Sequence, residues 1–174
     1  MLIFSLTQIS CKRDNRDDTC DTPYKIHNIK LSQNVEDSIY EFKFDSINLT
    51  IYTEWNYVGD VWCDPNPVLV DYYKTIEIIT LNEFNLTYNS LDTITNNFNI
   101  EYLKVDNRGM PEYEDYNSFY ELFQTYQSKP IAYGLSMKLI SPPDSIRQLR
   151  LKVIINLWDN REFVLESKPI IIKP

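Results

Sequence analysis

The sequence predicts an all-β protein, mainly an antiparallel β-sandwich with one or two short helical insertions. Apolar and polar side chains alternate over much of the chain, which is the pattern of half-buried strands. Turn-forming residues recur at intervals of about ten residues, which favours a sandwich over alternating strands and helices. The alternation is clearest near the end of the chain, where apolar residues occupy every second position: Leu149, Leu151, Val153, Ile155 and Leu157.

Taken in order, the same signals predict about eight to ten short strands. The first, at residues 24–31, is expected to be irregular where Ile26 and Ile29 break the alternation. A long loop is expected at residues 56–67. The last strand must pair with an early strand, because an unpaired apolar edge invites aggregation. Near its end the chain is expected to form a closing hairpin. The other predicted strands lie at residues 39–44, 47–55, 68–73, 75–81, 99–105, 131–140 and 170–172.

Two helical segments interrupt the strand pattern. A short helical turn is expected at residues 90–98, and the better candidate is a helix at residues 113–127. Within the second segment, Ser118 and Glu121 have the spacing of a capping box. The apolar side chains that follow the cap fall on one face: Phe119, Leu122, Phe123 and Tyr126.

The closing hairpin leaves three apolar side chains outside the predicted core. Residues 158–161 supply the turn chemistry, because Asp and Asn tolerate turn conformations. Ile154 and Val164 lie on the outer side of the hairpin, and Trp158 lies in its turn. These side chains are expected to be covered by the predicted helix, by a neighbouring loop or by a partner.

Composition excludes several classes of function. The 174 residues suit one domain, and the formal net charge of −8 argues against nucleic-acid binding, which needs clustered Lys and Arg. No run reaches the length of about 18 apolar residues that a membrane-spanning helix needs. His27 is the only histidine, and the chain has three glycines, so no multi-histidine site, nucleophile elbow or phosphate-binding loop is present. We therefore expect no catalytic residues, no metal, no cofactor and no enzymatic activity.

The first residues resemble the end of a bacterial lipoprotein signal peptide. A mostly apolar run reaches the small residue Ser10, Cys11 follows, and charged residues come next. In that family the peptidase cuts before the cysteine, whose thiol carries the lipid. The pattern departs from the family at Gln8, where leucine is usual, and it lacks a basic leading region. The other interpretation is an apolar strand with a core cysteine.

The resemblance divides the chain into three parts. Residues 1–10 would be a residual signal peptide, residues 11–22 a lipidated tether and residues 23–174 a single sandwich domain. Cys11 would be the lipidation site, which anchors a protein to a membrane without spanning it.

Cys20 and Cys63 remain as an even pair. Outside the cytoplasm they could form a disulfide that closes a loop of about 43 residues, worth roughly 3–4 kcal/mol. The alternative is two unpaired thiols.

Longer features resemble uncharacterised Bacteroidetes lipoproteins. They are the acidic tether with CDTPY, the middle segment TIEIITLNEFNLTYNSLDTITNNF and the terminal FVLESKPIIIKP. This resemblance implies an immunoglobulin-like sandwich in the cell envelope, as an outer-membrane lipoprotein facing the periplasm or the surface. It carries no assigned activity.

We therefore expect a non-enzymatic binding or accessory module, with the membrane as one partner and a glycan or another envelope protein as a second. The alternative is a glycan-binding or adhesin-type domain that uses Tyr57, Asp60, Trp62 and Asp64. Aromatic side chains beside carboxylates are suited to stacking on sugar rings. The other interpretation is that Trp62 packs into the end of the sandwich. A glycoside hydrolase is a remote third hypothesis, because paired carboxylates are expected by chance among 25 acidic residues.

A tripeptide of Asp, Ser or Thr, and Ile occurs four times. It resembles the acceptor motif for O-glycosylation of exported Bacteroidetes proteins. The other interpretation is turn chemistry that leads into a strand. The four hydroxyl residues are Ser38, Ser46, Thr93 and Ser145.

Overall fold

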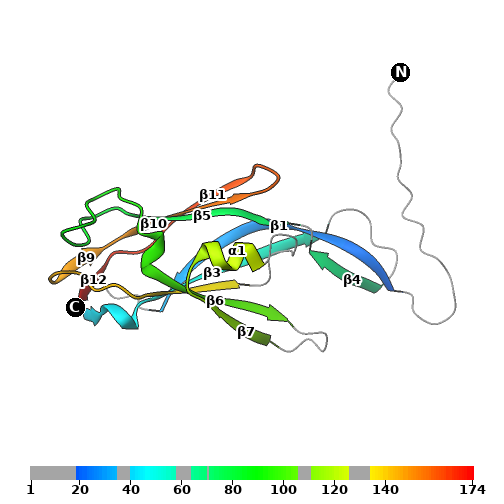
Figure 1. Ribbon diagram of the computed structural model, residues 1–174. Helices are drawn as coiled ribbons and strands as arrows, with labels where there is room; N and C mark the ends of the chain where they lie inside the picture. Colours follow the sequence, from blue (N-terminus) through cyan, green and yellow to red (C-terminus); the bar gives the residue numbers. More distant parts are fainter. Residues whose placement is uncertain (1–18, 35–39, 58–63, 70, 106–110, 126–133) are drawn as a thin grey trace, which may run out of the picture.

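The computed structural model confirms the all-β prediction. Most of the elements are strands, their pairing is mainly antiparallel, and a single α-helix occurs among the described residues. The immunoglobulin-like order of strands stays a prediction. The structure describes the following parts of the chain, and Figure 1 draws the rest as a grey trace: residues 19–34, 40–57, 64–69, 71–105, 111–125 and 134–174.

The described residues form twelve strands, one α-helix and two 3-10 turns. The helix α1 spans Phe119–Thr125, and the 3-10 turns span Phe44–Ser46 and Thr95–Asn97. The strands are β1 Thr19–Gln33, β2 Glu41–Lys43, β3 Asn48–Tyr57, β4 Asp64–Leu69, β5 Tyr73–Thr80, β6 Phe98–Val105, β7 Pro111–Tyr116, β8 Gly134–Leu139, β9 Arg147–Leu149, β10 Leu151–Leu157, β11 Glu162–Glu166 and β12 Ile170–Lys173.

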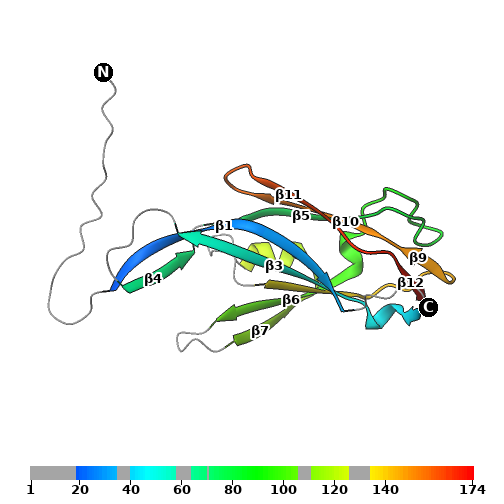
Figure 2. The same ribbon diagram turned by 180° about the vertical axis from the view of Figure 1, so that it is seen from behind.

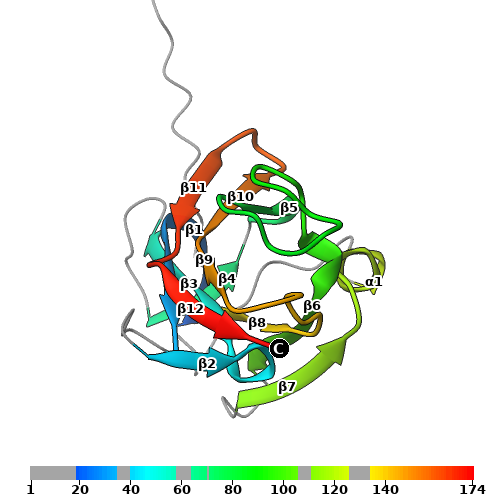
Figure 3. The ribbon, with the colours of Figure 1, turned by 90° about the vertical axis from the view of Figure 1, so that its left-hand side faces the viewer.

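These strands form three sheets, which enclose a common interior in the end-on view of Figure 3. The large sheet has the order β4-β1-β3-β8-β6-β7, the hairpin sheet β11-β10-β5 and the end sheet β2-β12-β9. Figures 1 and 2 show the hairpin sheet lying over the large sheet, with the end sheet at the end away from β4. Two pairings are parallel, β1 with β4 and β12 with β2. The last strand therefore pairs with an early strand, as the sequence predicts.

The predicted alternation places the core correctly. In β10, every second side chain is buried, and the residues between them are half-buried. The facing strands of the large sheet contribute the other half of the core through the same period of two. Burial of each such aliphatic side chain contributes about 1.5–3 kcal/mol before conformational entropy is subtracted. The side chains from β10 are Leu151, Val153, Ile155 and Leu157, each at most 1% exposed.

The unbroken alternation from Leu149 to Leu157 predicts one half-buried strand, and that prediction is wrong. The chain leaves the end sheet after β9 and enters the hairpin sheet with β10, so Arg150 lies between two strands. The carbonyl of Arg150 instead accepts a hydrogen bond from the N–H of Leu81 at 2.8 Å. The alternation continues through the switch because both sheets face the same core, and the sequence pattern therefore gives no sign of it.

The predicted helix at residues 113–127 is correct only in its second half. β7 occupies the first half and pairs antiparallel with β6. The cap at Ser118 is as predicted, since its Oγ accepts the N–H of Glu121 at 3.2 Å. α1 begins directly after this cap and buries Phe119 and Leu122. Strand pairing, which the local sequence does not report, holds the preceding residues in an extended conformation.

Other boundaries differ by smaller amounts. β1 begins at Thr19, five residues before the predicted start, and β4 occupies part of the predicted loop at residues 56–67. These two segments pair with each other in parallel, so neither was visible from local alternation. The expected irregularity in β1 is confirmed by a register shift between Ile26 and Asn28. The predicted helical turn at residues 90–98 is reduced to one 3-10 turn.

The apolar side chains on the outside of the hairpin stay largely open. Val164 is 49% exposed and Trp158 is 63% exposed, while Ile154 is half-buried between its neighbours. The ammonium of Lys74 lies 5.9 Å from the centroid of the Trp158 ring, which is within cation–π range.

An ion pair between the buried Asp71 and the partly exposed Arg161 joins the large sheet to the hairpin sheet. β4 ends opposite Tyr24, and the next backbone groups on this edge of β1 belong to Ile26. The N–H of Ile26 donates to Oδ2 of Asp71 at 2.5 Å, and its carbonyl accepts a hydrogen bond from Nη1 of Arg161. Nη2 of Arg161 lies 2.6 Å from Oδ1 of Asp71, which is 4% exposed.

Arg161 follows the turn of the β10–β11 hairpin. Asn160 adopts a φ of 68° there, which Asn tolerates better than most residues. Burial opposes the charge of Arg161, but its interactions with Asp71 and Asp159 outweigh that cost and raise the pKa of the guanidinium. Both backbone groups of Ile26 are therefore satisfied by one ion pair from outside its own sheet.

We predict that Arg161→Ala lowers the free energy of unfolding by about 3 kcal/mol, because Asp71 would be left buried without its cation. Urea unfolding followed by tryptophan fluorescence measures this loss. The matched control is Arg150→Ala, which removes an exposed ion pair with Glu166 and should cost at most about 1 kcal/mol. Equal losses in the two variants would contradict the role of the pair between Arg161 and Asp71.

Candidate functional site

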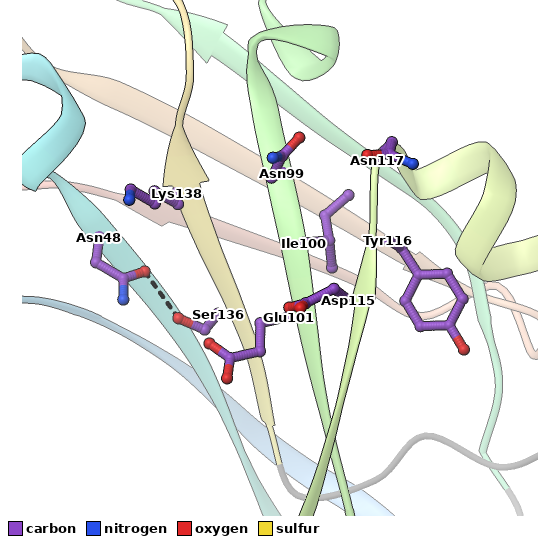
Figure 4. A pocket seen from close by; sticks show the side chains of 9 residues that line it. All are labelled: Asn48, Asn99, Ile100, Glu101, Asp115, Tyr116, Asn117, Ser136 and Lys138. Atoms are coloured by element: carbon purple, nitrogen blue, oxygen red, sulfur yellow. Dashed lines mark hydrogen bonds between the residues drawn. The ribbon is translucent and has the colours of Figure 1, made fainter.

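A polar hollow of about 380 Å³ lies on the outer face of the large sheet. We call it the sheet hollow. β3, β8, β6 and β7 supply most of its lining, and Figure 4 shows the side chains drawn from these neighbouring strands. Its volume falls in the lower part of the range of about 300–1,000 Å³ that is typical of ligand sites. The lining residues are Asn48, Asn99, Ile100, Glu101, Asp115, Tyr116, Asn117, Ser136 and Lys138.

Strand register builds the sheet hollow from residues that are distant in sequence. One row across the sheet joins Asn48, Lys138 and Asn99 as successive Cα partners. The inward neighbours of these residues on β3, β8 and β6 belong to the core, so period-two alternation directs the row outward. The sheet hollow and the core are thus opposite faces of the same four strands.

A second row contains a pair of acidic residues directly opposite each other. Glu101 on β6 is the Cα partner of Asp115 on β7, and Ser136 on β8 is the partner of Glu101 on its other side. Figure 4 shows both carboxylates on the side of the sheet that carries the hollow. Like charges that lie directly opposite on neighbouring strands are destabilising. The fold therefore carries an electrostatic cost at this position.

Several polar side chains of the sheet hollow have no partner among the described residues. Ser136 donates its hydroxyl proton to Oδ1 of Asn48 at 2.7 Å, and Asn117 donates to Glu121 at 3.3 Å. By contrast, within the described part of the chain, no hydrogen bond or ion pair involves these side chains: Asn99, Glu101, Asp115 and Lys138. Their carboxylate, amide and ammonium groups are available to a ligand.

The residues predicted for glycan binding are described only in part. Asp60 and Trp62 lie outside the described residues. Tyr57 ends β3 and Asp64 begins β4, and the structure describes the backbone of both. The sheet hollow contains none of these four residues.

The cysteines can be placed only partly as well. Cys11 and Cys63 lie outside the described residues, while Cys20 is the second residue of β1. The predicted disulfide and the predicted lipid anchor therefore stay predictions.

Three of the four predicted O-glycosylation residues are described, and all three are exposed. Ser46 ends a 3-10 turn and donates its hydroxyl proton to the carbonyl of Lys43 at 2.6 Å. Ser145 donates to Oδ1 of Asp144 at 3.2 Å, and Thr93 forms an isolated bridge with Ile79. Ser38 lies outside the described residues. Ser46 and Ser145 make local hydrogen bonds typical of turns, and all three hydroxyl residues are accessible.

His27 is exposed and lies at the register shift of β1. The part of the chain that the structure describes contains no group of three or more His, Cys, Asp or Glu that could hold a metal ion. Its single helix is too short to cross a membrane.

Comparison with known proteins does not assign the sheet hollow. No family model matches the chain, and neither the curated proteins nor the solved structures give a significant match. Inferences about function therefore rest on the residues themselves.

Sequence reasoning missed the residues of the sheet hollow. Alternation correctly directs Glu101 and Lys138 outward, but many other polar residues share that pattern. Only the pairing of β3, β8, β6 and β7 brings these residues together. No motif in the sequence could have identified them.

We predict that Asp115→Asn raises the free energy of unfolding by about 0.2–1 kcal/mol, because it removes the repulsion with Glu101. Chemical denaturation at low salt measures the gain, which should shrink in about 1 M NaCl, where the screening length is about 3 Å. Glu162→Gln, on the outer face of the hairpin sheet, is the control and should change stability by less than about 0.5 kcal/mol. A loss of stability on Asp115→Asn would contradict the repulsion.

Proposed function

We propose that this protein is a non-enzymatic binding module of the cell envelope, anchored by a lipid at Cys11, and that it holds its ligand in the sheet hollow. The observation that carries the binding role is the set of unpaired polar side chains around this hollow. Two of these side chains are carboxylates placed directly opposite each other, an arrangement that lowers local stability. Departures from local stability of this kind are expected at functional sites.

The start of the first strand limits how far the domain could stand from an anchor at Cys11. β1 begins at Thr19, eight positions after Cys11. A fully extended segment of that length spans at most about 29 Å. An anchored domain would therefore stand close to the membrane, and one lipidated residue would hold it there without a spanning segment.

The second candidate is a glycan-binding or adhesin-type domain. The sequence points to the segment of Trp62 for this role, and the chemistry of the sheet hollow offers another location for a saccharide. A glycoside hydrolase stays a remote alternative. Glu101 and Asp115 would be its carboxylates, but Asp115 is exposed to solvent on an open sheet face, where the exclusion of water that strengthens catalytic electrostatics is absent.

The anchor is tested by metabolic labelling of the native host with a lipid analogue. We expect the protein to carry the label and Cys11→Ser to lose it. Cys20→Ser is the matched control and should keep the label, because Cys20 belongs to β1. A wild-type chain without label, or a label that survives Cys11→Ser, would defeat the anchor.

A further inference from the structure

We infer that the sheet hollow binds a neutral saccharide through hydrogen bonds from its hydroxyl groups to Glu101 and Asp115. This inference rests on the proposed binding role and names the class of ligand. It assigns the saccharide to the outer face of β6, β7 and β8, and not to the segment around Trp62.

The two carboxylates require a ligand that donates hydrogen bonds. An ionised carboxylate is an acceptor only, with two oxygens that can accept from several donors. Glu101 and Asp115 occupy directly opposite positions and have no donor among the side chains that the structure describes. Hydroxyl groups that donate to both carboxylates would form charge-assisted hydrogen bonds and reduce the repulsion between them.

The remaining polar groups supply the complementary donors and acceptors. Lys138 and Asn99 are direct partners in the row next to Glu101. The ammonium donates only, and an amide both donates and accepts. A sugar hydroxyl also both donates and accepts, so a ring that carries several hydroxyls can satisfy this mixed set.

Charge argues against other ligand classes. The sheet hollow contains two acidic side chains and one basic side chain, and the whole chain has a formal net charge of −8. A polyanion such as a nucleic acid or a sulfated glycan would be repelled, because phosphate and sulfate binding needs clustered cations. A polyamine would pair with the two carboxylates. It carries no acceptor oxygens, however, for the N–H donors of Lys138 and Asn99.

The test uses the full 174-residue chain, labelled with ¹⁵N, and follows its amide signals by NMR during titration. The neutral probes are cellotriose, maltotriose and chitotriose. Spermidine and a heparin tetrasaccharide are the cationic and anionic probes. We expect at least one neutral probe to shift the signals of residues 99–101, 115–117 and 136–138 saturably below about 10 mM, as a Kd of about 1 mM or tighter would give.

The double variant Glu101→Gln and Asp115→Asn should weaken that binding about tenfold or more, because neutral amides make weaker hydrogen bonds than carboxylates. The matched control is Glu77→Gln with Glu162→Gln, which removes two exposed charges from the hairpin sheet and should leave the affinity unchanged. Retained heteronuclear spectra show that both double variants are folded.

Four results would overturn the inference. They are no saturable shift with any neutral probe, a response to spermidine or heparin alone, shifts confined to residues 56–67, and equal affinity in the two double variants. Lipid labelling at Cys11 is measured separately, so failure of saccharide binding leaves the anchor standing. A response to spermidine in the sheet hollow would keep the binding role and replace the ligand class. New reducing ends in the titrated samples would contradict the non-enzymatic role.

Discussion

The ion pair between Arg161 and Asp71 is the constraint on which the assembly of the sheets depends. It satisfies both backbone groups of Ile26 at the point where β4 no longer covers the edge of β1. Arg161 comes from the hairpin sheet and Ile26 from the large sheet, so one pair fixes the two layers against each other. Removal of either partner would leave the other charge or backbone group uncompensated.

The large sheet, once fixed in this way, serves two purposes. Its inner face supplies aliphatic side chains to a continuous core, and its outer face carries the sheet hollow. The inner face is mainly apolar, because burying an unpaired polar group costs free energy. The outer face differs at Glu101 and Asp115, where strand pairing places two carboxylates together. This arrangement lowers local stability, and the proposed binding role rests on it.

Local sequence signals predicted the features that depend on neighbouring residues. They missed the features that depend on pairing with a distant strand. The cap at Ser118 was readable because its hydrogen bond to the N–H of Glu121 spans three residues. The extended conformation just before it was not readable, since pairing of β7 with β6 imposes it. Arg150 marks a change of sheet that leaves the alternation intact, and β4 finds its partner in a strand far earlier in the chain.

The sequence by itself determined the all-β class, the inward and outward faces of the strands with clear alternation, such as β10, and the turn at Asn160. Each of these follows from period-two geometry or from the conformational tolerance of a single residue. Only the tertiary structure decided that Asn48, Lys138, Glu101 and Asp115 share one hollow. The reason is register: a pairing shifted by two residues would keep every core side chain inside and bring a different set of polar groups together outside.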